Sequence, residues 1–258
     1  MRSILVQAGR DAQNSVRLDS AMEVARAREG HVTLLIDTPI DRFVTVDPYG
    51  GTYVAREALE AAVADDNALA ELFEGRLANE DVPFDVAKFE TAPVEAMAAV
   101  GKLADLIVVS QGCGFAGDLA VEARCPVLVL PQDKPLRLPL TTACIAWDGG
   151  EQAAVALRSA VPLLQSCANV HVLTVLDTAA GGFPPTDALR YLARHGITSE
   201  LHEKGGAAGP VGPALIAVAS QLRAQYLVMG AYGHTRAREY LFGGVTRDLL
   251  KDSPIIVY

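Results

Sequence analysis

The apolar residues of this chain fall into short runs separated by stretches with helical spacing. Runs such as SILVQAG (3–9) and LIVVS (106–110) are almost uninterrupted, which indicates strands buried on both faces. Between the runs, apolar positions recur at helical spacing in residues 15–28, 55–78, 93–104, 151–164, 186–195 and 211–224. Because strands and helices alternate, the pattern predicts parallel sheets with helices on both faces and right-handed crossovers.

The same pattern occurs twice along the chain. SILVQAG aligns with ACIAWDG (143–149), and at the same offset HVTLLIDT (31–38) aligns with HVLTVLDT (171–178). Two further pairs follow, LIVVS with YLVMG (226–230) and CPVLVL (125–130) with SPIIVY (253–258). Several matches in the same order indicate an internal duplication.

A linker with three prolines, PQDKPLRLP (131–139), separates the two copies. We therefore expect two tandem α/β domains, residues 1–132 and 140–258, each with a five-stranded parallel sheet flanked by helices. The last strands of the two copies, PVLVL and PIIVY, are expected to contact each other in a pseudo-dimer, because an edge strand needs a partner or a cover.

Composition excludes several classes of partner and site. A net charge of −9 argues against nucleic acid or an anionic membrane as the main partner. The four cysteines show no CxxC spacing and no paired histidine motif, so neither a zinc site nor a disulfide framework is indicated. No apolar run approaches the length of a membrane span, and Asp11 interrupts the segment where a signal peptide would continue. We expect a cytoplasmic protein.

The candidate chemistry lies in GAYGHTRAREYLFGGVTRDLL (230–250), directly after a buried strand. Gly230, Gly233 and Gly243 suit a turn with positive φ or a backbone that approaches a ligand closely. From Gly244 the spacing is helical, so Gly244, Val245 and Thr246 are expected at a helix N-terminus, where free N–H groups attract an anion. The segment is neither a Walker A loop nor a GxGxxG motif.

In an open parallel sheet the ligand crevice lies beyond the carboxyl ends of the strands. The first strand of the second copy ends at Asp148, which could accept hydrogen bonds from a ribose or an amino group; the first copy has Ala8 there. Two simpler interpretations stay open: Asp148 as a cap of the helix near Glu151, and the glycine segment as a turn only. Near the segment, His234, Arg236, Arg238 and Arg247 could add positive potential, although such residues more often lie on a solvated surface.

Other residues favour structural roles. His31 and His171 occupy equivalent strand entries, while His195 and His202 have no visible partner in the sequence. Trp147 is expected in the core. The long segment 42–57 of the first copy is either a functional lid or contact surface, or a strand–helix connection that covers that copy's vacant crevice, and we prefer the second interpretation.

The spacing Gly230, Gly233, Gly243 followed by Val245 and Thr246 resembles the nucleotide-binding pattern of the ATP-binding universal stress proteins, and the resemblance covers both copies. It implies an adenine nucleotide alpha hydrolase-like fold. By similarity, Asp148 would face the ribose or adenine and Val175 would lie beside the adenine. Gly230 and Gly233 would line the ribose and phosphate path, and Gly243, Gly244, Val245 and Thr246 would hold the phosphates.

Two departures from the family pattern affect nucleotide binding, one in each copy. Gly244 stands where ATP-binding members commonly have Ser or Thr, and the lost hydroxyl would cost ~0.5–1.5 kcal/mol. The corresponding segment of the first copy, SQGCGFAGDLAVEARCPVLVL, is shorter and lacks both the strand-end acid and the GxVT sequence. We expect that copy not to bind ATP in the same way.

The resemblance implies a stress-response protein that binds ATP or a related adenine nucleotide, with or without Mg²⁺, as a regulatory ligand, and that forms a homodimer through sheet edges. No catalytic constellation stands out, so no activity beyond weak ATP hydrolysis is expected. The alternatives are a scaffold of the same fold that binds no nucleotide and, less favoured, a slow ATPase or adenylating enzyme.

Overall fold

The computed structural model describes residues 1–46, 52–175, 182–205, 211–231, 249–250 and 253–258. The chain forms two compact units. The first consists of Met1–Val109 with Glu122–Val127, and the second of Ser110–Val121 with Leu128–Tyr258. The domain limits 1–132 and 140–258, which were inferred from the sequence, stay predictions.

The first unit has a parallel sheet with the strand order β5-β2-β1-β6. Its elements are β1 (Ser3–Gln7), α1 (Asn14–Arg28), β2 (His31–Asp37), β5 (Phe84–Phe89), α3 (Pro93–Val100), η2 (Gly101–Leu103) and β6 (Leu106–Ser110). The inner strands β1 and β6 are apolar and buried, as their sequences predict. The edge strand β5 contains partly buried and exposed residues instead.

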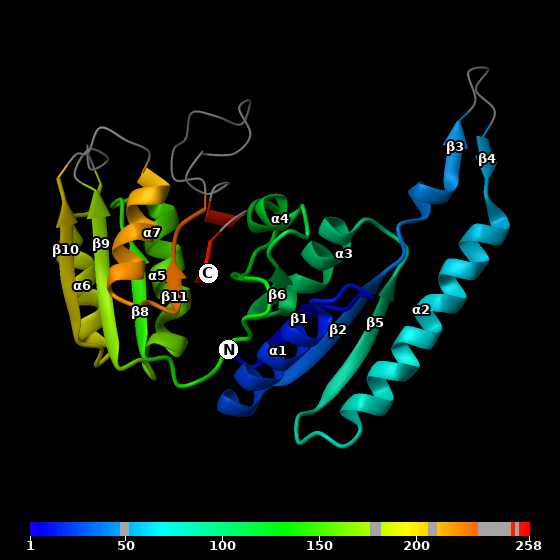
Figure 1. The fold of residues 1–258 in the computed structure, drawn as a ribbon, viewed down its shortest axis with the longest axis horizontal. Helices are drawn as coiled ribbons and strands as arrows, with labels where there is room; N and C mark the ends of the chain where they lie inside the picture. Colours follow the sequence, from blue (N-terminus) through cyan, green and yellow to red (C-terminus); the bar gives the residue numbers. More distant parts are fainter. Residues whose placement is uncertain (47–51, 176–181, 206–210, 232–248, 251–252) are drawn as a thin grey trace. The chain divides into compact units, whose positions relative to one another are not determined.

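An insertion between β2 and β5 forms a separate antiparallel hairpin. The insertion comprises η1 (Ile40–Phe43), the hairpin strands β3 (Val44–Val46) and β4 (Thr52–Val54), and the 22-residue helix α2 (Arg56–Leu77). Val44 pairs with Val54, and Figure 1 shows the hairpin beyond the carboxyl end of β2, beside the start of α2. The segment 42–57 therefore contains a small sheet of its own, which the sequence pattern did not indicate.

The second unit repeats the topology, with the strand order β10-β9-β8-β11-β12-β7. Its elements are α4 (Ala116–Glu122), β7 (Val127–Leu130), β8 (Thr142–Ala146), α5 (Glu151–Leu164), β9 (Asn169–Val175), α6 (Pro185–Arg194), β10 (Ser199–Lys204), α7 (Val211–Gln221), β11 (Tyr226–Val228) and β12 (Ile256–Val257). All neighbours pair in parallel except β12 and β7, which pair antiparallel with Val257 opposite Val129. The expected contact between the sequences PVLVL and PIIVY is thus confirmed.

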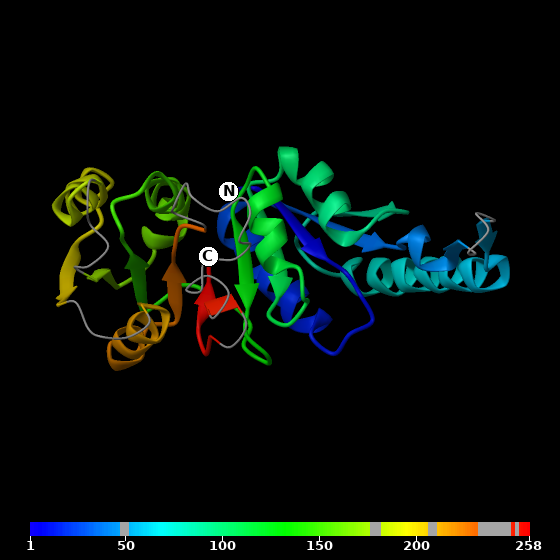
Figure 2. The ribbon, with the colours of Figure 1, turned by 90° about the horizontal axis from the view of Figure 1, so that it is seen from above.

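Helices cover both faces of the second unit's sheet. Figure 2 shows α5 and α6 on one face and α7 on the other, as right-handed crossovers require when the strand order reverses after the third strand. Under α7 lies an apolar core that includes Cys144, Leu173, Leu215 and Leu227. None of the helices in the described residues is both long and apolar enough to span a membrane.

Candidate functional site

Three of the predicted site residues lie at the edge of the second unit's sheet that is formed by the carboxyl ends of its strands. Asp148 follows β8 by two residues, Val175 ends β9, and Gly230 follows β11 by two residues. Because β8 lies between β9 and β11 and all three strands are parallel, their carboxyl ends face the same way (Figure 1). The chain leaves β8 toward β9 and later returns to β11, so the strand order reverses between β8 and β11. Open α/β sheets bind ligands at such a position.

Asp148 supports the start of helix α5. Its Oδ1 atom accepts a hydrogen bond of 2.8 Å from the backbone N–H of Gly150, the residue that caps the helix. The interpretation of Asp148 as the helix cap is wrong, because Gly150 holds the cap position without a side-chain cap hydrogen bond and Asp148 instead closes a turn just before the helix. Within the described part of the chain, Oδ2 has no hydrogen-bond partner, so it is available to a ligand.

Gly149 joins the end of β8 to a distant loop. Its φ of +77° favours glycine, and a Cβ atom there would lie 2.6 Å from the carbonyl oxygen of Phe183. The backbone N–H of Phe183 donates to the Gly149 carbonyl (2.9 Å), and the Trp147 indole Nε1–H donates to the Phe183 carbonyl (3.0 Å). Trp147 is buried, as expected, and anchors Phe183 beside the end of β8.

Gly230 lies against the first turn of α5. A Cβ atom at this position would come within 2.5 Å of the Ala153 backbone nitrogen. The sequence suggested that the backbone after this strand approaches something closely, and in the structure its neighbour is a helix. This packing gives Gly230 a structural reason to be glycine, whatever ligand binds nearby.

Val175 belongs to the core under α7, together with Leu173, Leu215 and Ala219. A cavity of ≈ 290 Å³ lies between β9, β10 and α7. Neither Asp148 nor Gly230 lines it; the lining includes Leu173, Val175, His202, Lys204, Leu215 and Val218. Val175 thus ends β9 at the predicted edge, but the residue is only 8% exposed.

The remaining predicted residues, Gly233, Gly243, Gly244, Val245 and Thr246, lie outside the described residues, as do His234, Arg236, Arg238 and Arg247. Their roles stay predictions. Of the glycine-rich segment 230–250, the structure describes residues 230–231 and 249–250.

The equivalent edge of the first unit is occupied by an ion pair. Arg17 of α1 is 1 % exposed, and its Nε–H donates 2.8 Å to the carbonyl of Gln7, the last residue of β1. Its two terminal nitrogens donate to both carboxylate oxygens of Asp11 at 2.8 and 2.6 Å. This hydrogen bonding to Arg17 lowers the pKa of Asp11 below its usual value.

Two further carboxylates lie near this edge of the first unit. Burial raises the pKa of Asp37, the last residue of β2, and also that of Asp66 on α2. The Asp66 carboxylate accepts a hydrogen bond from the Thr38 hydroxyl. Asp11, Asp37 and Asp66 thus all lie near the carboxyl ends of the first unit's strands.

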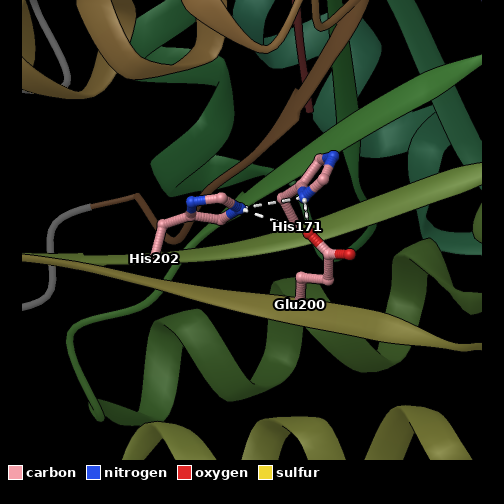
Figure 3. A group of neighbouring side chains, drawn as sticks. All are labelled: His171, Glu200 and His202. Atoms are coloured by element: carbon pink, nitrogen blue, oxygen red, sulfur yellow. Dashed lines mark hydrogen bonds and ion pairs between the residues drawn. The ribbon is translucent and has the colours of Figure 1, made fainter.

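Sequence reasoning missed one cluster in the second unit. His171 on β9 lies beside His202 and Glu200 on β10, although the sequence showed no partner for His202 (Figure 3). The available signal was the spacing of Glu200 and His202, two residues apart in one short segment, since such residues share a face of a strand. The pairing of β10 with β9 could not be derived from that spacing.

Comparison with known proteins finds a family model that matches the second half of the chain. The model of the universal stress protein family matches residues 140–258. The structure is similar to that of a universal stress protein from Archaeoglobus fulgidus, with a TM-score of 0.71, 16% identity, and coverage of 99% of this chain and 94% of that one. A Pseudomonas aeruginosa protein described as functionally unknown aligns with a TM-score of 0.61, 18% identity, and coverage of 100% and 91%. At these identities the similarity shows a common fold.

A shorter structure, a universal stress protein family protein from Arabidopsis thaliana with AMP bound, covers 52% of this chain and 93% of its own at 19% identity. Its TM-score of 0.36 is too low to bear on the ligand of the present chain. No curated protein matches the chain.

Proposed function

We propose that the second unit, where residues 140–258 match the model of the universal stress protein family, binds ATP or a related adenine nucleotide as a regulatory ligand. The proposal rests above all on the positions of Asp148 and Gly230. They flank the point where the strand order reverses, in the part of the chain that matches the family. The glycine-rich segment that would receive the phosphates starts at this edge with Gly230.

The second carboxylate oxygen of Asp148, which has no partner among the described residues, supports a contact with the ribose or the adenine amino group. Oδ1 is held by the Gly150 N–H, which fixes the orientation of the carboxylate. Oδ2 can then accept a hydrogen bond without disturbing the start of α5. A hydrogen bond to a charged group contributes about 1.5–3 kcal/mol, which corresponds to roughly 10- to 150-fold in affinity.

We propose that only the second unit binds the nucleotide. In the first unit, the Arg17 guanidinium already donates to the Gln7 carbonyl and to both carboxylate oxygens of Asp11 at the end of β1. Its positive charge is therefore paired within the protein, which disfavours its use for binding a phosphate. These contacts, and the absence of the GxVT sequence, support a single nucleotide per chain.

Equilibrium dialysis with ATP, ADP and AMP tests the proposal. We expect one nucleotide per chain, a roughly 10-fold or greater loss of affinity in Asp148→Asn, and loss of binding in Gly233→Val. Asn keeps an oxygen for the Gly150 N–H but presents an NH₂ group in place of Oδ2, so the variant separates ligand contact from the turn at Gly150. Asp118→Asn, on the exposed surface of α4, removes the same charge and should leave affinity unchanged.

Two results would count against the proposal. Equal ATP retention by the parent chain, Asp148→Asn and Gly233→Val would mean that the nucleotide binds elsewhere. No binding of any adenine nucleotide would favour a scaffold of the same fold, whereas two equivalents per chain would contradict the confinement to the second unit.

A further inference from the structure

Two imidazoles and a carboxylate meet on the α7 face of the second unit's sheet. In the β9–β10 pair, Glu200 lies opposite His171 and His202 lies opposite Leu173. Residues paired in parallel register share a face, and so do residues two apart on one strand. Leu173 packs in the core under α7, so all three polar side chains emerge on that face (Figure 3).

The donor atoms lie close enough to share one ion. His202 Nε2 is 3.0 Å from His171 Nδ1, and Glu200 Oε2 is 3.6 Å from His171 Nδ1 and 3.9 Å from His202 Nε2. Ligands about 2.0–2.1 Å from a tetrahedral zinc ion stand roughly 3.3–3.4 Å apart. The three atoms therefore need to shift by only a few tenths of an ångström to reach that geometry.

We propose that His171 Nδ1, His202 Nε2 and the Glu200 carboxylate bind a divalent transition-metal ion, Zn²⁺ in particular. Two imidazole nitrogens select against Mg²⁺ and Ca²⁺, which prefer all-oxygen ligand sets. Three protein ligands leave the fourth tetrahedral position for water or another small ligand. On binding, the hydrogen shared between the two rings moves to the outer nitrogen of its own ring, so both ligating nitrogens present lone pairs.

The surroundings suit a metal that enters from solvent. The side chains of His171, His202 and Glu200 are 12%, 34% and 74% exposed, so the carboxylate lies at the surface and the inner imidazole is nearly buried.

The first unit provides an internal contrast. His31, the counterpart of His171, lies 3.3 Å from Asp85 through its Nε2 atom, and Asp85 also accepts a hydrogen bond from Thr33. Asp85 lies opposite the residue two after His31, just as His202 lies opposite the residue two after His171, so Asp85 and His202 occupy equivalent positions. A single imidazole with one carboxylate does not make the three-ligand set.

The metal site is separate from the proposed nucleotide site. His171 precedes Val175 by four residues on β9, about 13 Å along the strand from the edge where Asp148 lies. A metal here would join β10, the edge strand of the second unit's sheet, to β9. Metal binding should therefore stabilise the second unit without requiring the nucleotide.

Zn²⁺ titration of the tag-free full chain by calorimetry, in competition with a chelator, tests the proposal. We expect one Zn²⁺ per chain and a loss of affinity of at least about tenfold in His202→Gln and in His171→Gln. Zn²⁺ should raise the Tm of the parent chain and leave that of His202→Gln unchanged. Far-UV circular dichroism without metal checks that each variant is folded; His202, being partly exposed, is the variant expected to fold normally.

His31→Gln and Asp148→Asn serve as matched controls, and both should bind Zn²⁺ like the parent chain. Co²⁺ identifies the ligands: nitrogen and oxygen ligation gives tetrahedral d–d bands without the thiolate-to-metal band of a cysteine site. The proposal is overturned if no stoichiometric binding occurs, if binding survives in both His202→Gln and His171→Gln, or if Co²⁺ shows thiolate ligation. Loss of ATP binding in Asp148→Asn with Zn²⁺ binding intact would show that the two sites are independent.

Discussion

Gly230 lies so close to helix α5 that a Cβ atom at its position would stand 2.5 Å from the backbone nitrogen of Ala153 and 2.6 Å from the carbonyl carbon of Gln152. Both neighbours are backbone atoms of the helix's first turn, which cannot rotate away. The end of β11 and the start of α5 therefore pack together only with glycine at this position. The same two elements border the proposed nucleotide site.

We expect Gly230→Ala to lower the free energy of unfolding by about 1–3 kcal/mol, because the added methyl group must push β11 away from α5. Urea denaturation followed by circular dichroism measures the change. ATP affinity should fall as well, since Asp148 and the glycine segment would move relative to each other.

Gly75→Ala is the matched control. Gly75 lies in the exposed part of α2 near its end, and nothing lies within 4 Å of the position of its Cβ. Alanine there should raise the free energy of unfolding by about 0.5–1 kcal/mol, because glycine is the poorer helix former. If both variants are destabilised equally, the contact with Ala153 is not the cause of the effect at position 230.

The Asp11–Arg17 ion pair predicts a pH dependence of stability. The pKa of Asp11 is lowered in the folded state. The stability that Asp11 contributes is therefore complete above the ordinary pKa of 3.8 and is lost as pH falls through the lowered pKa. Asp11→Asn should cost about 1–2 kcal/mol near neutral pH, less than for a fully buried pair because the Asp11 side chain is 51% exposed.

The difference in the free energy of unfolding between the parent chain and Asp11→Asn should therefore be constant from pH 5 upward and should shrink below about pH 4. Thermal unfolding across that range measures it. A difference that persists undiminished at the acid end would mean that Asp11 acts through its shape and hydrogen bonds rather than its charge.

The thiol of Cys144 should be unreactive in the folded protein. It is fully buried, and burial raises its pKa to about 12, while burial also raises the pKa of Cys125 to about 11. At pH 8 both thiols are protonated, and the thiolate is the reactive form. Alkylation followed by peptide mass spectrometry should leave Cys144 unmodified until the protein is unfolded in denaturant; rapid labelling of the native chain would contradict this.

Local sequence patterns predicted most helices and inner strands of this protein. The helix expected at 151–164 coincides with α5, and the continuous apolar runs became β1, β2, β6, β8, β9 and β11. These features depend on spacing within a few residues, which the sequence displays directly. The third strand of each unit could not be located in this way, because β5 and β10 are edge strands with charged residues among the apolar ones.

The sequence by itself also determined the duplication and the position of Asp148 and Gly230 at strand ends, since both follow from order along the chain. Only the tertiary structure decided which residues meet: Gly230 with α5, Arg17 with the end of β1, and His171 with His202. Those contacts depend on which strands pair and in what register. Register is set by the packing of whole elements, and no short stretch of sequence contains that information.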